Sequence, residues 1–485
     1  MEKKLGSSAL HLTFSKMLVM VLSLVTGMLL SRFRTLEEYG TYSQLMIIIN
    51  TATAFIMLGL PNSTNFFLAR AETSEEKRDF LSVYYTFNTF LCVVLGAVLV
   101  IIVPFVEKYF KNDTISNFAY FLAIYPWAHI TFSSISNVLV VYGKTIKLIL
   151  LNLAVSAVSL ASVIIIQLLG LTFNDYMIAF LIGNVLIAIV IYIIVYRLEK
   201  GIKLKVDISL IKKILAYSIP IGLASLVGTL NIEMDKLMIG RLMDTESLAV
   251  YTNAGRELPL TIVATSLTAV LLPQMARQLK NNENEKAVKL WGVAIDLSYI
   301  IMAFFVTACI VFAPQVMTIL YSQKYIGGVN VFRVYALVLL LRVTYFGIVL
   351  NAVGKTKFIF WSSIISLTLN VGLNYLLFVV IGFTGPAWAS LLSILLVNLL
   401  QLLYTCKAIN ISFKNIFPWG KLLKISIINI AWGIICYVIV KVFDIGISNT
   451  DILITVAIGA VVSCVYLVIM RRKVFADWKE LNSAE

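Results

Sequence analysis

Five ionisable side chains lie close together in the sequence, within two long apolar stretches of the chain. Glu233, Asp235 and Lys236 fall in the first stretch, and Arg256 and Glu257 fall in the second. Charged groups at such depth are costly, so they usually face a water-filled cavity or pair with one another. Glu233 and Lys236 are three residues apart and share one face of a helix. We expect these charges to meet at one level between two antiparallel helices. They would form a buried ion-pair cluster or an ion or substrate-coupling site, or they would snorkel to the membrane interface.

Arg342 is the deepest charge, near the middle of a predicted membrane helix over 329–353. No acidic residue precedes or follows it within one turn. Arg333 is nine residues away, so on an unbroken helix the two arginines would face opposite sides. Because a guanidinium fork suits phosphate or pyrophosphate, we predict that Arg342 faces a cavity through which an anionic head group crosses.

Lys16 and Arg32 extend this set of basic side chains along the first apolar stretch, from its inner part to its outer end. The predicted cationic, substrate-binding path consists of Arg342, Arg256, Lys236, Lys16 and Arg32. The acids predicted to couple an ion or to pair charges are Asp235, Glu233, Glu257 and Asp296. No catalytic residue and no metal site is predicted, and the cysteines show no disulfide or zinc spacing.

The tripeptide Gly-Lys-Thr occurs twice, at 143–145 and 354–356, and it matches the end of a nucleotide-binding loop. Such a loop requires a further glycine five positions earlier, after a strand. Val138 and Val349 stand there instead, inside predicted membrane helices. We therefore interpret the tripeptide as a turn, in which glycine ends a helix and lysine stays in cytoplasmic water.

The composition indicates which elements must position these charges. The chain has 485 residues, of which 60% are hydrophobic and 13% are charged, whereas soluble globular chains carry about 25% charged residues. Apolar runs of about 20 residues, long enough to cross a bilayer core, recur along the whole chain. We therefore predict an all-α polytopic membrane protein with about fourteen transmembrane helices. The predicted spans are 10–31, 41–60, 80–106, 118–142, 146–170, 176–197, 213–240, 249–273, 289–320, 329–353, 357–381, 386–406, 421–441 and 451–471.

The basic residues also predict the orientation of the chain. With the N-terminus inside, the inner segments and their flanks carry 27 Lys and Arg residues, and the outer ones carry 7. The positive-inside rule then makes both termini cytoplasmic. The same bias accounts for most of the formal net charge of +14, so no nucleic-acid partner is expected.

An internal repeat relates the two halves of the chain. The two Gly-Lys-Thr copies lie 211 residues apart, and Gly170 and Gly382 follow them at nearly the same offset. Each half holds six predicted spans, an even number, so both enter the membrane in the same orientation. Such parallel repeats build transporters with a site between the halves. We predict an N-terminal lobe over 1–197, a cytoplasmic linker over 198–212, a C-terminal lobe over 213–406, and two further helices with a cytoplasmic tail over 407–485.

Three blocks of the sequence resemble the polysaccharide flippases of the multidrug/oligosaccharidyl-lipid/polysaccharide exporter superfamily. They cover 27–70, which begins GMLLSRFRTLEEYG, then 212–275 and 370–393. Their marks are Pro220, the sequence DKLMIG at 235–240, Tyr251, the pair Leu272 and Pro273, and Gly385. Each mark is common by itself, but their order and spacing are more specific.

The resemblance implies that the protein moves undecaprenyl-pyrophosphate-linked oligosaccharide repeat units from the inner to the outer leaflet of a bacterial cytoplasmic membrane by alternating access. It implies a lipid-linked oligosaccharide as substrate, membrane lipids around the chain, and a polysaccharide polymerase and glycosyltransferases as candidate partners. By the same resemblance, the last two helices are candidates for a groove that takes the lipid tail. No cofactor is predicted, while the buried acids make H⁺ or Na⁺ a candidate coupling cation.

Other functions stay open from the sequence. One alternative is a lipid II flippase, although the stretch from Ser31 to Arg34 departs from the Gly-rich pattern of that branch. Another is a multidrug or metabolite exporter of the same superfamily, for which twelve spans rather than fourteen are typical. An alternative of a different class is a membrane-embedded glycan-modifying enzyme, but the predicted outer loops leave little room for its site. Only His11 and His129 could serve as a catalytic histidine.

Overall fold

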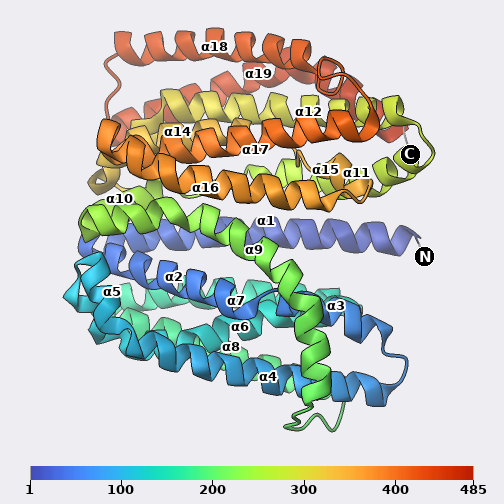
Figure 1. Ribbon diagram of the computed structural model, residues 1–485. Coiled ribbons are helices and arrows are strands. Elements are labelled where there is room, and N and C mark those ends of the chain that lie inside the picture. The colour runs from blue at the N-terminus through green and yellow to red at the C-terminus, as the bar shows by residue number, and fades with distance from the viewer. Residues whose placement is uncertain (1, 484–485) are drawn as a thin grey trace. The chain divides into compact units, whose positions relative to one another are not determined.

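The computed structural model describes the backbone of residues 2–483 and the side chains of residues 15–268 and 271–479. Within these ranges every regular element is a helix, and no strand occurs (Figure 1). The prediction of an all-α chain is therefore confirmed.

Nine helices of the described chain are long and apolar enough to cross a membrane, or up to ten if the bent pair α2 (Leu36–Met57) and α3 (Leu60–Arg70) counts as one span. One candidate, Thr356–Ile409, contains two helices that pack against each other, α16 (Thr356–Ile381) and α17 (Gly385–Ile409). The chain is thus a multi-pass membrane protein, and the number of fourteen spans stays a prediction.

The chain divides into two compact units, Met1–Ala249 and Val250–Glu485. Unit 1 holds α1 (Glu2–Phe33), α2, α3, α4 (Ser74–Ile101), α5 (Val103–Phe110), η1 (Asp113–Phe118), α6 (Ala119–Val141), α7 (Thr145–Leu168), α8 (Phe173–Leu198) and α9 (Ile208–Leu242). Helix α10 (Thr245–Ala254) contains the division point. Unit 2 continues with α11 (Thr261–Lys280), α12 (Asn284–Val311), α13 (Ala313–Tyr321), η2 (Gln323–Gly328), α14 (Val329–Leu340), α15 (Ile348–Ala352), α16, η3 (Gly382–Thr384), α17, α18 (Trp419–Val442) and α19 (Asn449–Ser483).

Helix α9 belongs to the first compact unit, although the repeat assigns its residues to the C-terminal lobe. It packs against α2, α3, α4 and α5. The compact division therefore falls within α10, about one helix later than the boundary predicted at 198–212. The repeat in the sequence reflects the duplication of a six-helix segment. The compact units instead depend on which helices pack against one another, so the two boundaries differ.

A bend lets α9 follow the bent pair α2 and α3. Figure 1 shows α9 turning along its length, and Pro220 lies inside this helix, where it removes a hydrogen bond and kinks the backbone. Helices α2 and α3 meet at 42° around Leu58 and Gly59. Gly222 of α9 lies directly against the Leu58 backbone, because a Cβ atom there would overlap it. The bend of α9 therefore packs against the bend between α2 and α3, and only glycine fits at position 222 of this contact.

We expect Gly222→Ala to destabilise unit 1 by about 1–3 kcal/mol, because the methyl group would force the two backbones apart. The matched control is Gly228→Ala on the same helix, where a Cβ atom meets nothing within 4 Å. Alanine there should stabilise the helix by about 0.5–1 kcal/mol. Thermal unfolding of the two purified variants should therefore shift in opposite directions, and equal shifts would contradict the close crossing.

The two Gly-Lys-Thr segments form the same turn. Gly143 and Gly354 both adopt left-handed backbone angles, with φ of 64° and 74°. In both turns the lysine N–H donates to a carbonyl five residues earlier, at 2.8 Å: Lys144 to Leu139, and Lys355 to Leu350. The next helix begins at the threonine in each case. The prediction that glycine ends a helix here is confirmed.

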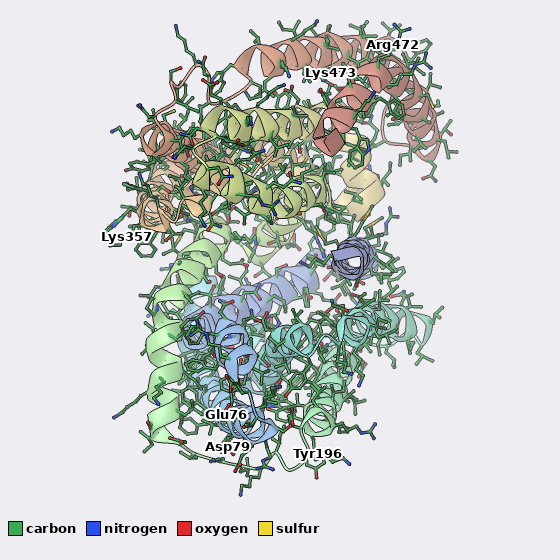
Figure 2. The ribbon with its side chains drawn as sticks, turned by 90° about the vertical axis from the view of Figure 1, so that its right-hand side faces the viewer. Glu76, Asp79, Tyr196, Lys357, Arg472 and Lys473 are labelled. Carbon is green, nitrogen blue, oxygen red and sulfur yellow. The ribbon has the colours of Figure 1, made fainter. Side chains whose placement is uncertain are left out.

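The predicted linker is an extended segment bonded to α4. The Lys205 ammonium pairs with the Asp79 carboxylate at 2.7 Å, and the Lys205 N–H donates to Thr86 Oγ1 at 3.1 Å. Figure 2 shows Asp79 at the same end of unit 1 as Tyr196, which lies near the end of α8. The segment thus ties the end of α8 to the start of α9 within unit 1.

Candidate functional site

Two of the predicted membrane helices of unit 2 contain a long non-helical segment. Helix α10 ends at Ala254 and α11 begins at Thr261. Helix α14 ends at Leu340 and α15 begins at Ile348. The predicted spans 249–273 and 329–353 are therefore not continuous helices. Pro259 explains the first interruption, since proline and the residue before it are poorly compatible with a helix. For the second, Val343, Thr344 and Gly347 lower the helix propensity.

The two interruptions are joined by an ion pair. Arg342 Nη1 lies 2.9 Å from Glu257 Oε1, and the side chains are 35% and 46% exposed. Each residue lies in the non-helical segment of its own interrupted helix. At membrane depth, non-helical backbone is tolerated only where it is buried in protein or lines a cavity. The pair is therefore a charged, accessible group at a position typical of transporter binding sites.

Neighbouring helices hold the 341–347 interruption in place. Asn398 of α17 donates from Nδ2 to the Leu341 carbonyl oxygen at 2.8 Å. The buried Trp291 of α12 donates from Nε1 to Thr344 Oγ1 at 2.8 Å. Both bonds come from side chains that the sequence did not single out. They replace part of the hydrogen bonding that the broken helix loses.

We expect Asn398→Leu to destabilise unit 2 by about 1–3 kcal/mol, because it leaves the Leu341 carbonyl without its donor. Amide hydrogen exchange should rise over 341–347 while the remaining helices keep their protection. The matched control is Asn184→Leu. Its amide donates to Phe180 O four residues earlier in the same helix, so no interruption loses a bond. Unchanged exchange over 341–347 would show that Asn398 does not hold the interruption.

Tyrosine contacts align the two interrupted helices. The hydroxyl groups of Tyr251 and Tyr335 lie 3.4 Å apart. A Cβ atom on Gly255 would lie 2.9 Å from the Tyr335 ring. Helices α10 and α14 thus approach closely just before their interruptions, which brings Glu257 within reach of Arg342. Arg256, the next residue to Glu257, is half-buried in the same segment.

The acids of α9 lie in a buried cluster of unit 1. Lys236 Nζ lies 3.0 Å from Glu233 Oε2, as their three-residue spacing predicted. Asn50 of α2 donates from Nδ2 to the other oxygen of Glu233 at 3.2 Å. Asp235 is 2% exposed. Glu233 and Glu257 therefore each pair with a basic residue of their own unit.

Asp296 forms a separate ion pair in unit 2. It is fully buried in α12, and its Oδ2 lies 2.8 Å from Nζ of Lys421 at the start of α18. Neither carboxylate oxygen accepts an aligned hydrogen bond from the described residues, so the ammonium group supplies most of the charge compensation. The sequence did not single out Lys421 as a partner of Asp296.

Helix α1 carries two residues of the predicted cationic path, Lys16 and Arg32. Lys16 and Arg32 both expose their side chains on unit 1. The buried Arg34, by contrast, donates from Nη1 to the Leu171 carbonyl at 3.2 Å, which ties the end of α1 to the connection between α7 and α8. Among the residues with described side chains, no group of three or more His, Cys, Asp or Glu side chains could hold a metal ion.

Solved structures with a similar fold are a flippase and transporters. A lipid II flippase, MurJ, in an inward closed conformation has a TM-score of 0.73 and 17% identity, over 96% of this chain and 99% of that one. An inward-facing multidrug resistance MATE family transporter of the MOP superfamily has a TM-score of 0.67 and 17% identity, over 81% and 94%. A MOP superfamily transporter from Pyrococcus furiosus has a TM-score of 0.55 and 18% identity, over 83% and 95%. These neighbours are not enzymes, and they show that this chain has the fold of such membrane proteins.

The sequence comparisons agree with this fold. No curated protein sequence matches the chain. The model of one protein family, described as polysaccharide biosynthesis protein, matches residues 29–330. The match identifies the family, and the fold is the one that the flippase and the transporters named above share. Since the match covers more than half of the chain, the protein belongs to the polysaccharide biosynthesis protein family.

Proposed function

We propose that this protein is a flippase that translocates undecaprenyl-pyrophosphate-linked oligosaccharide repeat units from the inner to the outer leaflet by alternating access. Membership of a polysaccharide biosynthesis family supports a glycan cargo. The lipid II flippase neighbour aligns over 96% of this chain, against 81% for the multidrug transporter. That difference favours a cargo linked to a lipid over a soluble drug.

The observation that carries this proposal is the position of Arg342 in an interrupted helix. A sugar-pyrophosphate cannot cross bare hydrocarbon, because an unpaired charge there is prohibitive. Arg342 presents a partly exposed guanidinium group, whose fork can bind two phosphate oxygens at once. In the absence of cargo, Glu257 compensates this charge at 2.9 Å. The pyrophosphate would therefore compete with Glu257 for Arg342, with Arg256 as a second cation beside it.

Release of Glu257 also suggests how an ion could be coupled to transport. A carboxylate that loses its arginine partner attracts another cation, which makes H⁺ or Na⁺ a candidate coupling cation. Glu233, Asp235 and Asp296 are further candidate groups, although Glu233 and Asp296 already hold a basic partner. On this proposal Lys16, Arg32 and Lys236 guide the anionic head group along the path.

The proposed setting is a bacterial cytoplasmic membrane with both termini in the cytoplasm. The excess of Lys and Arg in the inner segments supports this orientation. Glycosyltransferases would then supply the lipid-linked substrate at the inner leaflet, and a polysaccharide polymerase would consume it at the outer leaflet.

A vesicle assay tests the proposal. The purified protein is reconstituted into liposomes that carry an undecaprenyl-pyrophosphate-linked disaccharide with a fluorescent label, and a membrane-impermeant quencher reports which leaflet holds the label. We expect the protein to speed up label exchange between leaflets, and to do so more for this lipid than for lipid II. Exchange no faster than in empty liposomes would contradict a flippase. Faster exchange of lipid II, or export of a cationic drug alone, would favour the alternatives within the superfamily.

A further inference from the structure

A cavity lies in unit 2, where α12, the segment 410–418 and the start of α18 meet. We call it the loop pocket. Its volume is about 760 Å³, within the range of about 300–1,000 Å³ that small-molecule sites occupy. Neither Arg342 nor Glu257 lines it. The mechanism proposed above therefore leaves this cavity without a role.

The lining of the loop pocket combines hydrogen-bonding groups with an apolar wall. The polar residues that line it are Glu285, Lys289, Asn410, Ser412, Asn415 and Lys421, and all of them expose their side chains. The apolar residues Val288, Val293, Ile416 and Phe417 are buried behind them. Amide and hydroxyl groups both donate and accept hydrogen bonds. The pocket thus offers donors and acceptors beside an apolar surface.

Charges at the loop pocket largely compensate one another. Lys421 is already paired with Asp296 at 2.8 Å. Glu285 lies four residues before Lys289 on α12, a spacing at which opposite charges attract. A phosphate group would therefore find little net positive charge there. An uncharged ligand with many hydroxyl groups and an apolar ring face fits such a lining better, and these are the features of a saccharide.

The wall of the loop pocket also supports the interrupted helix. Phe417 packs on Phe346 with ring centres 5.4 Å apart, and on Trp291 at 5.7 Å. Trp291 in turn donates its hydrogen bond to Thr344 within the interruption. A ligand in the pocket would thus contact the residue that packs against the segment carrying Arg342.

We propose that the loop pocket binds a saccharide unit and forms a second subsite for the sugar part of the cargo. The pocket lies at the end of α12 that follows residues 281–283, which the positive-inside rule assigns to the cytoplasm. The sugar would therefore be held before translocation, while the pyrophosphate binds elsewhere. The identity of the cargo rests on the proposed function, but sugar binding is measurable without any translocation.

Gly292 allows the loop pocket to be filled without disturbing the fold. It lines the pocket, and a Cβ atom on it would meet nothing within 4 Å. Gly292→Trp therefore places an indole ring in the cavity. The matched control is Gly372→Trp on α16, where a Cβ atom also meets nothing within 4 Å and the residue is exposed. Unchanged thermal unfolding of both variants establishes that they fold.

Saturation-transfer NMR on the purified protein tests sugar binding directly. The probes are glucose, galactose, N-acetylglucosamine and rhamnose, each alone, with inorganic phosphate and glucose 1-phosphate as charge probes. We expect at least one free sugar to bind the native protein and the Gly372→Trp control, and to lose its signal with Gly292→Trp. Asn415→Ala should weaken that binding at least fivefold.

Two results would overturn the saccharide subsite. In the first, no sugar distinguishes the native protein from Gly292→Trp. In the second, only the phosphate compounds bind and inorganic phosphate displaces them, which identifies an anion site. Failure of the proposed function would give a different result. The native protein would then move no lipid-linked sugar in vesicles, whereas free sugars would still bind it and Gly292→Trp would still abolish that binding.

Discussion

Arg342→Ala should reduce translocation of the lipid-linked disaccharide at least about tenfold, since hydrogen bonds to a charged group contribute about 1.5–3 kcal/mol and about 1.4 kcal/mol corresponds to a factor of ten. The variant removes the guanidinium group that the interrupted α14–α15 segment presents. It also leaves Glu257 without its basic partner. The measurement is the initial rate of leaflet exchange in vesicles with matched protein content.

Three further variants separate cargo binding from loss of the ion pair. Arg342→Lys keeps the charge but not the two-pronged geometry, so its rate should fall between those of the native protein and Arg342→Ala. Glu257→Gln removes the competing carboxylate and should bind the cargo at least as tightly as the native protein does. Arg333→Gln is the matched control. Arg333 lies near the start of α14, and it donates to the Ile310 carbonyl of α12 and to Asn330 of α14. Native rates for Arg342→Ala would remove Arg342 from the path.

Lys421→Met should destabilise unit 2 by about 3 kcal/mol or more, because it leaves the fully buried Asp296 carboxylate without its counter-ion. The expected result is a clear drop in the thermal unfolding temperature of the purified protein.

The double variant Lys421→Met with Asp296→Asn provides the control. It removes both charges, so most of the stability should return, as found when both partners of a buried pair are replaced. Lys424→Met, three residues further along α18, tests whether loss of a lysine at this helix end is itself harmful. If Lys421→Met and Lys424→Met shifted the unfolding temperature equally, the ion pair would contribute no specific stability.

Local features of this protein could be predicted from the sequence because they depend on residues that are close in the chain. Apolar runs of membrane length predicted the helices. The three-residue spacing of Glu233 and Lys236 predicted that they share a face, and they do pair at 3.0 Å. The repeated Gly-Lys-Thr predicted two turns, and both have a left-handed glycine. Helix periodicity and turn chemistry act over a few residues, so a single sequence carries them.

The sequence did not predict the two interruptions. The hydrogen bonds that an interrupted helix loses are local, but the groups that replace them come from other helices. Gly255 and Pro259 disfavour a helix between α10 and α11, and both can be read from the sequence. The apolar pattern over 249–273 nevertheless fits a continuous helix. The hydrogen bonds that make the second interruption stable come from Asn398 and Trp291, on two other helices. Such donors become visible only when the helices are packed.

The sequence by itself determined the all-α membrane class, the charged residues that stand inside apolar stretches, and the duplicated turns. Only the tertiary structure decided which charges pair when they are far apart in the sequence. It brought Arg342 to Glu257 and Asp296 to Lys421, and it packed α9 against α2 and α3. The physical reason is that a buried charge pairs with the opposite charge that the packing of distant segments brings within about 3–4 Å. Such a pair has no characteristic spacing in the sequence, so it cannot be predicted from the sequence alone.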